Sequence, residues 1–154
     1  GHLLGGVLAA ILLGPFSGAI VISVVLMAQC LIFQDGGLTA LGANILNMAI
    51  LGTMGCYFIY NLIRKIIKTK NGMMIGTFMA AWFSVVIASI ACSIELAVSG
   101  TVPLSKVLPA MAGIHAIIGI GEAIITSLIV GFVLKVRPDL IYRALKKLDF
   151  PKGV

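Results

Sequence analysis

Only a few strongly polar side chains stand inside the long apolar tracts of this chain. His115 and Glu122 are seven residues apart in the tract from 103 to 136, and Asn44 and Asn47 are three apart near the start of another. Helical spacing puts the members of each pair on one face. Because an ionisable group in hydrocarbon is costly, such residues are candidates for function.

The two histidines, His2 and His115, are the strongest candidates for binding a metal ion. Neutral imidazole is a preferred ligand of nickel, copper, cobalt and zinc, whereas magnesium prefers oxygen ligands. Each histidine flanks an apolar tract that proline interrupts, at Pro15 and at Pro109. In transporters, interrupted membrane segments tend to contain the substrate site. A single histidine in a membrane helix is also often a hydrogen-bonded structural residue, so both interpretations of His115 stay open.

Glu122 has a structural and a functional interpretation. As a structural residue, it is a buried carboxyl group that bonds to a neighbouring helix or is protonated. As a functional residue, it belongs to a proton relay or a cation path together with His115, two helical turns away.

The amides of Asn44 and Asn47 are also ambiguous. They can hydrogen-bond across helices, or the segment from Asp35 to Asn47 can contact a substrate. Glu95 lies one turn before the end of its tract, where we expect it to reach water, and is a weaker candidate.

The elements that must position these side chains are membrane helices. The chain is 60% hydrophobic and 10% charged, whereas about a quarter of the residues of a soluble domain are charged. Apolar runs long enough to cross the hydrocarbon layer, which takes about 20 residues, recur along the chain. We therefore predict an all-α fold, a polytopic transmembrane helix bundle.

Breaks in the apolar pattern predict about four full spans plus shorter broken segments. Gly14-Pro15 breaks the first tract, because proline removes a backbone donor. The predicted helices before residue 100 cover 3–13, 16–33, 41–68 and 73–98. In the last tract, Pro109 and Gly113 predict a short segment before His115 and a longer helix after it.

Positive charges predict the orientation of the bundle. Of the eleven Lys and Arg residues, ten follow the third predicted helix or lie near the carboxyl end, and only Lys106 lies elsewhere. Cytoplasmic loops are enriched in these residues, so we predict a cytoplasmic carboxyl terminus. Asp35 and the His2 end then lie on the outer face. The loops account for the net charge of +6, and nucleic acid is not a predicted partner.

The predicted bundle covers residues 1–137, and residues 138–154 form a separate region. In that region apolar residues recur at helical spacing between basic ones. This pattern is typical of an amphipathic helix that lies on a membrane surface. We predict a cytoplasmic amphipathic tail.

Motifs for catalysis and nucleotide binding are missing from the sequence. It contains no GxxxxGK[ST], HExxH or GxSxG segment. Cys30, Cys56 and Cys92 stand singly in three apolar tracts, without metal-site spacing. We predict a protein that is not an enzyme and has no cofactor, and any uphill transport would take its energy from a partner.

Three segments, in this order, carry a resemblance to a known family: GHLLGGVLAAILLGP, DGGLTALGANILNMA and HAIIGIGEAIIT. Over about residues 1–137 the chain resembles the CbiM/NikM family, the substrate-capture (S) subunits of energy-coupling-factor (ECF) transporters for cobalt and nickel. The resemblance implies an ECF S-component-like bundle in the prokaryotic inner membrane that captures Co²⁺ or Ni²⁺ from the outer face. It implies as partners a transmembrane coupling subunit, cytoplasmic ATPase subunits and a small accessory membrane subunit.

The resemblance also implies a ligand set made of nitrogen atoms. In that family the ion is held by the amine, amide and imidazole of a Met-His start and by a second histidine in a Gly-His-Leu segment, which His2 matches here. We expect a segment with the Met-His start to precede Gly1. If Gly1 were the amino terminus, its amine, the amide and the His2 imidazole would form the chelate. Asp35 to Asn47 then pack around the captured ion.

Two other functions remain open. A proton-linked carrier or channel would use His115 and Glu122, and a structural membrane subunit would use the same residues to hold helices together. The choice between cobalt and nickel also stays open, because both ions accept nitrogen ligands.

Overall fold

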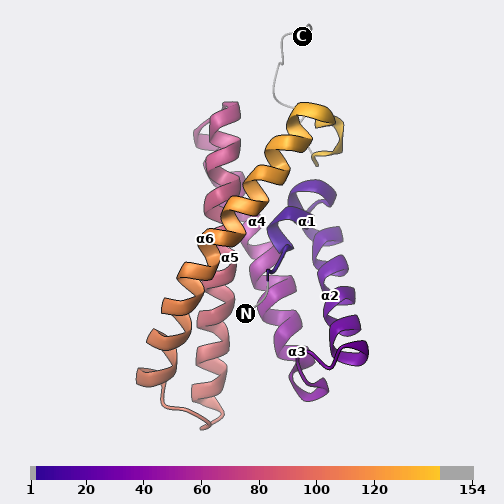
Figure 1. Cartoon of the computed structure of the whole chain (residues 1–154). Helices are drawn as coiled ribbons and strands as arrows, with labels where there is room; N and C mark the ends of the chain where they lie inside the picture. The colour runs from indigo at the N-terminus through magenta and orange to yellow at the C-terminus, as the bar shows by residue number, and fades with distance from the viewer. Residues whose placement is uncertain (1–2, 143–154) are drawn as a thin grey trace, which may run out of the picture.

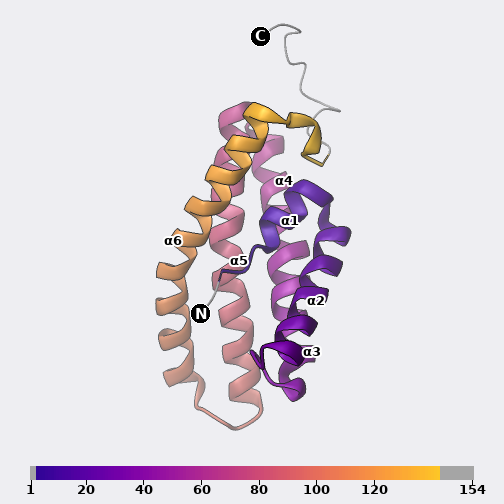
Figure 2. The same cartoon turned by 45° about the vertical axis from the view of Figure 1, so that its right-hand side comes forward.

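A computed structural model describes residues 3–142 as a bundle of helices (Figures 1 and 2). The α-helices are α1 (Gly6–Leu13), α2 (Pro15–Ile32), α3 (Leu41–Asn44), α4 (Cys56–Ile66), α5 (Lys70–Val98) and α6 (Leu104–Val136). Other helical elements are η1 (Leu38–Ala40), η2 (Ile45–Gly55) and η3 (Pro138–Leu140). This part of the chain contains no strand, and the predicted all-α class is confirmed.

Four helical stretches are long and apolar enough to cross a membrane. They are Pro15–Ile32, Leu38–Ile66, Lys70–Val98 and Leu104–Val136. Large apolar side chains such as Phe16, Ile32 and Leu128 are exposed on the outside of the bundle. In a membrane such side chains face lipid tails, so the chain has the surface of a multi-pass membrane protein, as predicted.

The predicted break at Gly14-Pro15 is confirmed, and it produces a tight helical hairpin. Gly14 has a φ of +94°, and Pro15 is the first residue of α2, a position where proline costs no helical hydrogen bond. A Cβ atom on Gly18 would lie 2.8 Å from the backbone nitrogen of Ala10. Small residues therefore let α1 and α2 approach closely, which stabilises helix pairs in lipid.

The third span contains an irregularity that the sequence pattern did not predict. Its middle, η2, is a π-helix of 11 residues. The Thr53 hydroxyl donates to the carbonyl of Met48, five residues earlier, at 2.9 Å. Because π-helical turns occur frequently at functional sites, η2, which carries Asn47, is of particular interest.

The predicted break in the last tract is wrong, because α6 is one helix of 33 residues that continues through Pro109 and Gly113. Pro109 is the sixth residue of α6, so its missing N–H costs one intrahelical bond, the one to the carbonyl of Ser105 in the first turn. α6 also packs against α5. There the Trp82 indole donates to the carbonyl of Ala116 at 3.0 Å.

The ends of the helices fall at two ends of the bundle (Figures 1 and 2). The end of α4, the start of α5 and the end of α6 meet at one end, and the α5–α6 connection lies at the other. Arg64, Lys65, Lys135 and Arg137 therefore belong to the same end. We call it the basic end.

The short helix α1 occupies only the half of the bundle nearer the basic end (Figure 2). Its Val7, Ala10 and Ile11 are completely buried in the main apolar core, against residues of α4, α5 and α6. The chain enters α1 beside the middle of α6, where the backbone of Leu4 and Gly5 bonds to Glu122. His2 itself lies outside the described residues.

Only the beginning of the predicted tail, 138–154, is described. η3 follows α6, and the backbone N–H of Tyr142 donates to the carbonyl of Ile11 at 2.9 Å. A hydrogen bond from the Arg137 guanidinium lowers the pKa of the Asp139 carboxyl. The amphipathic helix predicted beyond this point lies outside the described residues.

Candidate functional site

Glu122 connects the middle of α6 to the chain just before α1. One carboxylate oxygen accepts a hydrogen bond from the backbone N–H of Leu4 at 2.9 Å, and the other accepts one from Gly5 at 2.8 Å. The Glu122 residue is only 2% exposed. The structural interpretation predicted a bond to a neighbouring helix. The observed partner is backbone, which residue types do not reveal.

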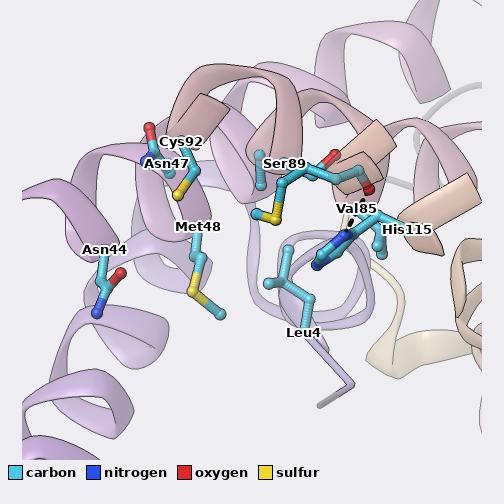
Figure 3. Close-up of a pocket in the computed structure, with 10 residues that line it drawn as sticks. Leu4, Asn44, Asn47, Met48, Val85, Ser89, Cys92 and His115 are labelled. Atoms are coloured by element: carbon cyan, nitrogen blue, oxygen red, sulfur yellow. Dashed lines mark hydrogen bonds between the residues drawn. The ribbon is translucent and has the colours of Figure 1, made fainter. Parts of the chain in front are cut away.

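A pocket of about 150 Å³ lies beside this segment, between η2, α5 and α6 (Figure 3). Most of its lining is apolar. The residues around it are Leu4, Asn44, Asn47, Met48, Val85, Ala88, Ser89, Cys92, Met111 and His115.

His115 lines this pocket and makes a hydrogen bond within its own helix. Its Nδ1 lies 2.7 Å from the carbonyl oxygen of Met111, one turn earlier in α6. A carbonyl oxygen only accepts hydrogen bonds, so Nδ1 is the donor, and in the neutral form of the ring Nε2 carries the lone pair. Figure 3 shows the ring beside Leu4. The residue is thus hydrogen-bonded, as the structural interpretation requires, and its Nε2 is still suited to bind a cation.

Asn47 links η2 to α5 through Glu95. The Asn47 side-chain nitrogen donates to a Glu95 carboxylate oxygen at 2.8 Å, and Asn47 is 4% exposed. This bond fits the interpretation of the amide as a link between helices. It also shows that Glu95, expected to face water, has a partner within the bundle. Among the described residues, the other polar atom of the Asn47 amide, Oδ1, is buried without a hydrogen-bond partner.

Asn44 and Asp35 lie toward the end of the bundle opposite the basic end. Asn44 lines the pocket, and its amide nitrogen would lie 2.7 Å from a Cβ atom on Gly36. The amide therefore sits against the loop that begins at Asp35. Asp35 itself is exposed and is not part of the pocket lining.

The pocket brings together three of the six predicted site residues, Asn44, Asn47 and His115. Glu122 joins the site indirectly, through its bond to Leu4, whereas Asp35 lies apart. Between residues 3 and 142, no group of three or more His, Cys, Asp and Glu side chains comes together as a metal site. Sequence reasoning did not predict the apolar and sulfur-containing part of the lining, because Met48, Cys92 and Met111 are ordinary core residue types.

The chain is similar to known metal transport proteins. Residues 1–140 match the family model CbiM, described as the cobalt uptake substrate-specific transmembrane region. The NikMN protein of Archaeoglobus fulgidus, whose name assigns it to nickel transport, is 41% identical over 91% of this chain and 46% of its own length. The cobalt transport protein CbiM of Thermosipho melanesiensis is 35% identical over 99% of this chain and 63% of its own length.

A solved structure has the same fold. The crystal structure of a transition metal transporter superposes with a TM-score of 0.80 and 33% sequence identity, over 88% of this chain and 65% of that one. The chain thus spans between about half and two thirds of the proteins it resembles. From the family match and these relatives, we conclude that the chain belongs to the CbiM family of cobalt uptake substrate-specific transmembrane regions.

Proposed function

We propose that this chain is the substrate-specific membrane subunit of an ATP-driven cobalt or nickel uptake transporter, with the divalent ion as its substrate. The observation that carries the proposal is the pocket that His115 shares with Leu4, two residues after His2, in a chain of the CbiM family. The names of the relatives, which refer to nickel and cobalt transport, support the class of substrate.

In this proposal His2 is the metal ligand, and the pocket adjoins it through Leu4. With the basic end in the cytoplasm, the pocket would lie on the outer side of Leu4, and an ion from the outer face would pass the polar groups of the pocket before it reached residue 2. Asn44 and Asn47 would line that path, and the Nε2 atom of His115 would supply a nitrogen lone pair. Asp35 would act at the outer loop. Imidazole nitrogen suits both cobalt and nickel.

The proposed orientation puts the basic end in the cytoplasm. Its Arg and Lys residues, which come from α4 and α6, support this assignment through the positive-inside rule. The carboxyl terminus is then cytoplasmic, and residues 138–154 form an amphipathic tail beyond the capture bundle of residues 1–137.

The proposed partners are a transmembrane coupling subunit, cytoplasmic ATPase subunits and a small accessory membrane subunit. The ATPases would supply the phosphate-binding loop that is missing from this sequence. Their hydrolysis of ATP would drive the loaded subunit to release its ion on the cytoplasmic side. The chain itself would then capture and deliver the ion without catalysing a reaction.

A calorimetric titration of the full-length protein with Co²⁺ and Ni²⁺ tests the proposal. The unaltered protein should bind one ion, and His2→Ala should weaken binding by at least about tenfold, because loss of a group that only orients a ligand already costs about that much. His115→Gln removes the second imidazole and should weaken binding less than His2→Ala does. Unchanged affinity in His2→Ala would remove His2 from the site.

A further inference from the structure

We infer that Glu122 is a positioning residue for metal capture: it fixes the backbone next to His2 and supplies negative charge at the end of α1. The inference rests on the proposed function. It concerns a side chain that lies outside the pocket lining and acts through the peptide groups of Leu4 and Gly5.

Glu122 makes a strong, two-pronged contact with the backbone before α1. Both oxygens of Glu122 are used, at 2.9 and 2.8 Å, by two successive backbone N–H groups. The carboxylate is 2% exposed, so water does not compete for these bonds. Hydrogen bonds to a charged group are roughly twice as strong as those between neutral groups. Two of them on successive N–H groups hold the segment in one conformation.

The contact lies close to His2 in the chain. Two peptide units separate Leu4 from His2, and two residues of extended chain reach at most about 7 Å. Fixing Leu4 therefore limits how far the imidazole of residue 2 can be displaced. The same helix α6 carries Glu122 and His115. Glu122 thus holds the backbone of Leu4 at a defined position relative to the His115 imidazole.

A side-chain cap from within α1 would not connect this helix to α6 as Glu122 does. Helix N-termini usually obtain an acceptor from a Ser, Thr, Asp or Asn side chain at the first position. Here that position is Gly5, which has a φ of +66° and makes no side-chain cap. The acceptor comes instead from a residue 117 positions away. A local cap would order α1 alone, whereas this one also ties α1 to the wall of the pocket.

The charge of Glu122 also acts on the amino end of α1. The amino end of a helix carries partial positive charge, which disfavours a cation close to it. The carboxylate of Glu122 lies at the amino end of α1 and opposes that effect. The residue therefore lowers the electrostatic penalty for a cation near the amino end of α1.

Two measurements on the full-length protein in detergent test the inference, namely Co²⁺ and Ni²⁺ affinity and hydrogen–deuterium exchange of the peptide that contains Leu4 and Gly5. Glu122→Gln keeps the size of the side chain but replaces one acceptor oxygen with an NH₂ group and removes the charge. We expect metal affinity about 10–100-fold weaker and faster exchange. Glu122→Asp, which keeps the charge but shortens the reach, should fall between Glu122→Gln and the unaltered protein.

Thr126→Val is the matched control, since Thr126 is one turn along α6 and also 2% exposed. It should leave affinity and exchange unchanged. Unchanged exchange in Glu122→Gln would overturn the anchor itself, and faster exchange with unchanged metal affinity would overturn its positioning role. If the unaltered protein bound neither ion, the proposed function would fail and the positioning role with it. Exchange would still decide whether the anchor exists.

Discussion

The backbone N–H of Tyr142 donates to the carbonyl of Ile11 at 2.9 Å, and a Cβ atom on Gly14 would lie 3.0 Å from the Tyr142 ring. The carboxyl end of α1 is therefore held by the chain that follows α6. Its amino end is held by Glu122 from the middle of α6. Since both ends of α1 are tied to α6 and its extension, we expect the two helices to move as one body.

Gly14 should not tolerate a side chain. Its φ of +94° and ψ of 159° belong to a region that only glycine occupies readily, and a Cβ atom would also press on the Tyr142 ring. We expect Gly14→Ala to cost about 1–3 kcal/mol. The thermal unfolding midpoint in detergent should fall measurably.

Gly113→Ala is the control for that substitution. Gly113 lies inside α6, and nothing comes within 4 Å of a Cβ atom placed there. Alanine in a helix is more favourable than glycine by about 0.5–1 kcal/mol, so the midpoint should rise or stay the same. Equal midpoints for Gly14→Ala and the unaltered protein would show that the α1–α2 turn is not held as described.

The hydrogen bond between Asn47 and Glu95 should survive an exchange of the donor and acceptor side chains. Asn47→Asp removes the donor and puts two carboxylates in contact. The loss should be at least the roughly 1.5–3 kcal/mol of a hydrogen bond to a charged group. Adding Glu95→Gln restores a donor on α5 that faces a carboxylate on η2. The double variant should unfold at a higher temperature than Asn47→Asp alone.

Glu95→Gln by itself completes the double-mutant cycle. If the two side chains interact, the changes should be non-additive by about 0.5–3 kcal/mol. Strictly additive midpoints would show that the amide and the carboxylate do not contribute to stability as a pair.

The sequence predicted the helices well where the pattern was strong and local. Gly14-Pro15 marked a real break, because it comes before the first residue of a helix that leaves in a new direction. Pro109 did not mark one, since near a helix start proline costs a single bond and packing on α5 outweighs it. The π-helical turn of η2 had no recognisable signal, because its residues are ordinary for a membrane helix.

Residue types predicted which side chains belong to the candidate site, but they did not predict the hydrogen-bond partners of those side chains. Rarity of polar residues in apolar tracts selected His115, Asn47 and Glu122, and all three have specific hydrogen bonds. Helical periodicity put His115 and Glu122 on one face, but it could not show that each bonds to a different backbone group. Contacts between residues more than 100 positions apart depend on the packing of the whole bundle, which spacing does not encode.

Filling the pocket should impair capture without unfolding the protein. Ala88 is a small residue of the lining, and Ala88→Leu adds three carbons to a space of about 150 Å³. We expect weaker Co²⁺ and Ni²⁺ binding with little change in the unfolding midpoint. Ala110→Leu, on the exposed surface of α6, is the control and should affect neither quantity. Unchanged affinity in Ala88→Leu would mean that the ion does not use the pocket.

The alternative of a proton-linked carrier makes a different prediction, which the geometry of α6 argues against. His115 and Glu122 are about 10 Å apart along the helix axis, and each bonds to backbone groups rather than to the other. A proton moving between them would need water in a largely apolar pocket. We expect no proton flux when the chain alone is placed in liposomes under a pH gradient and followed with a trapped pH-sensitive dye. Flux that disappears in Glu122→Gln would contradict this expectation and favour the carrier.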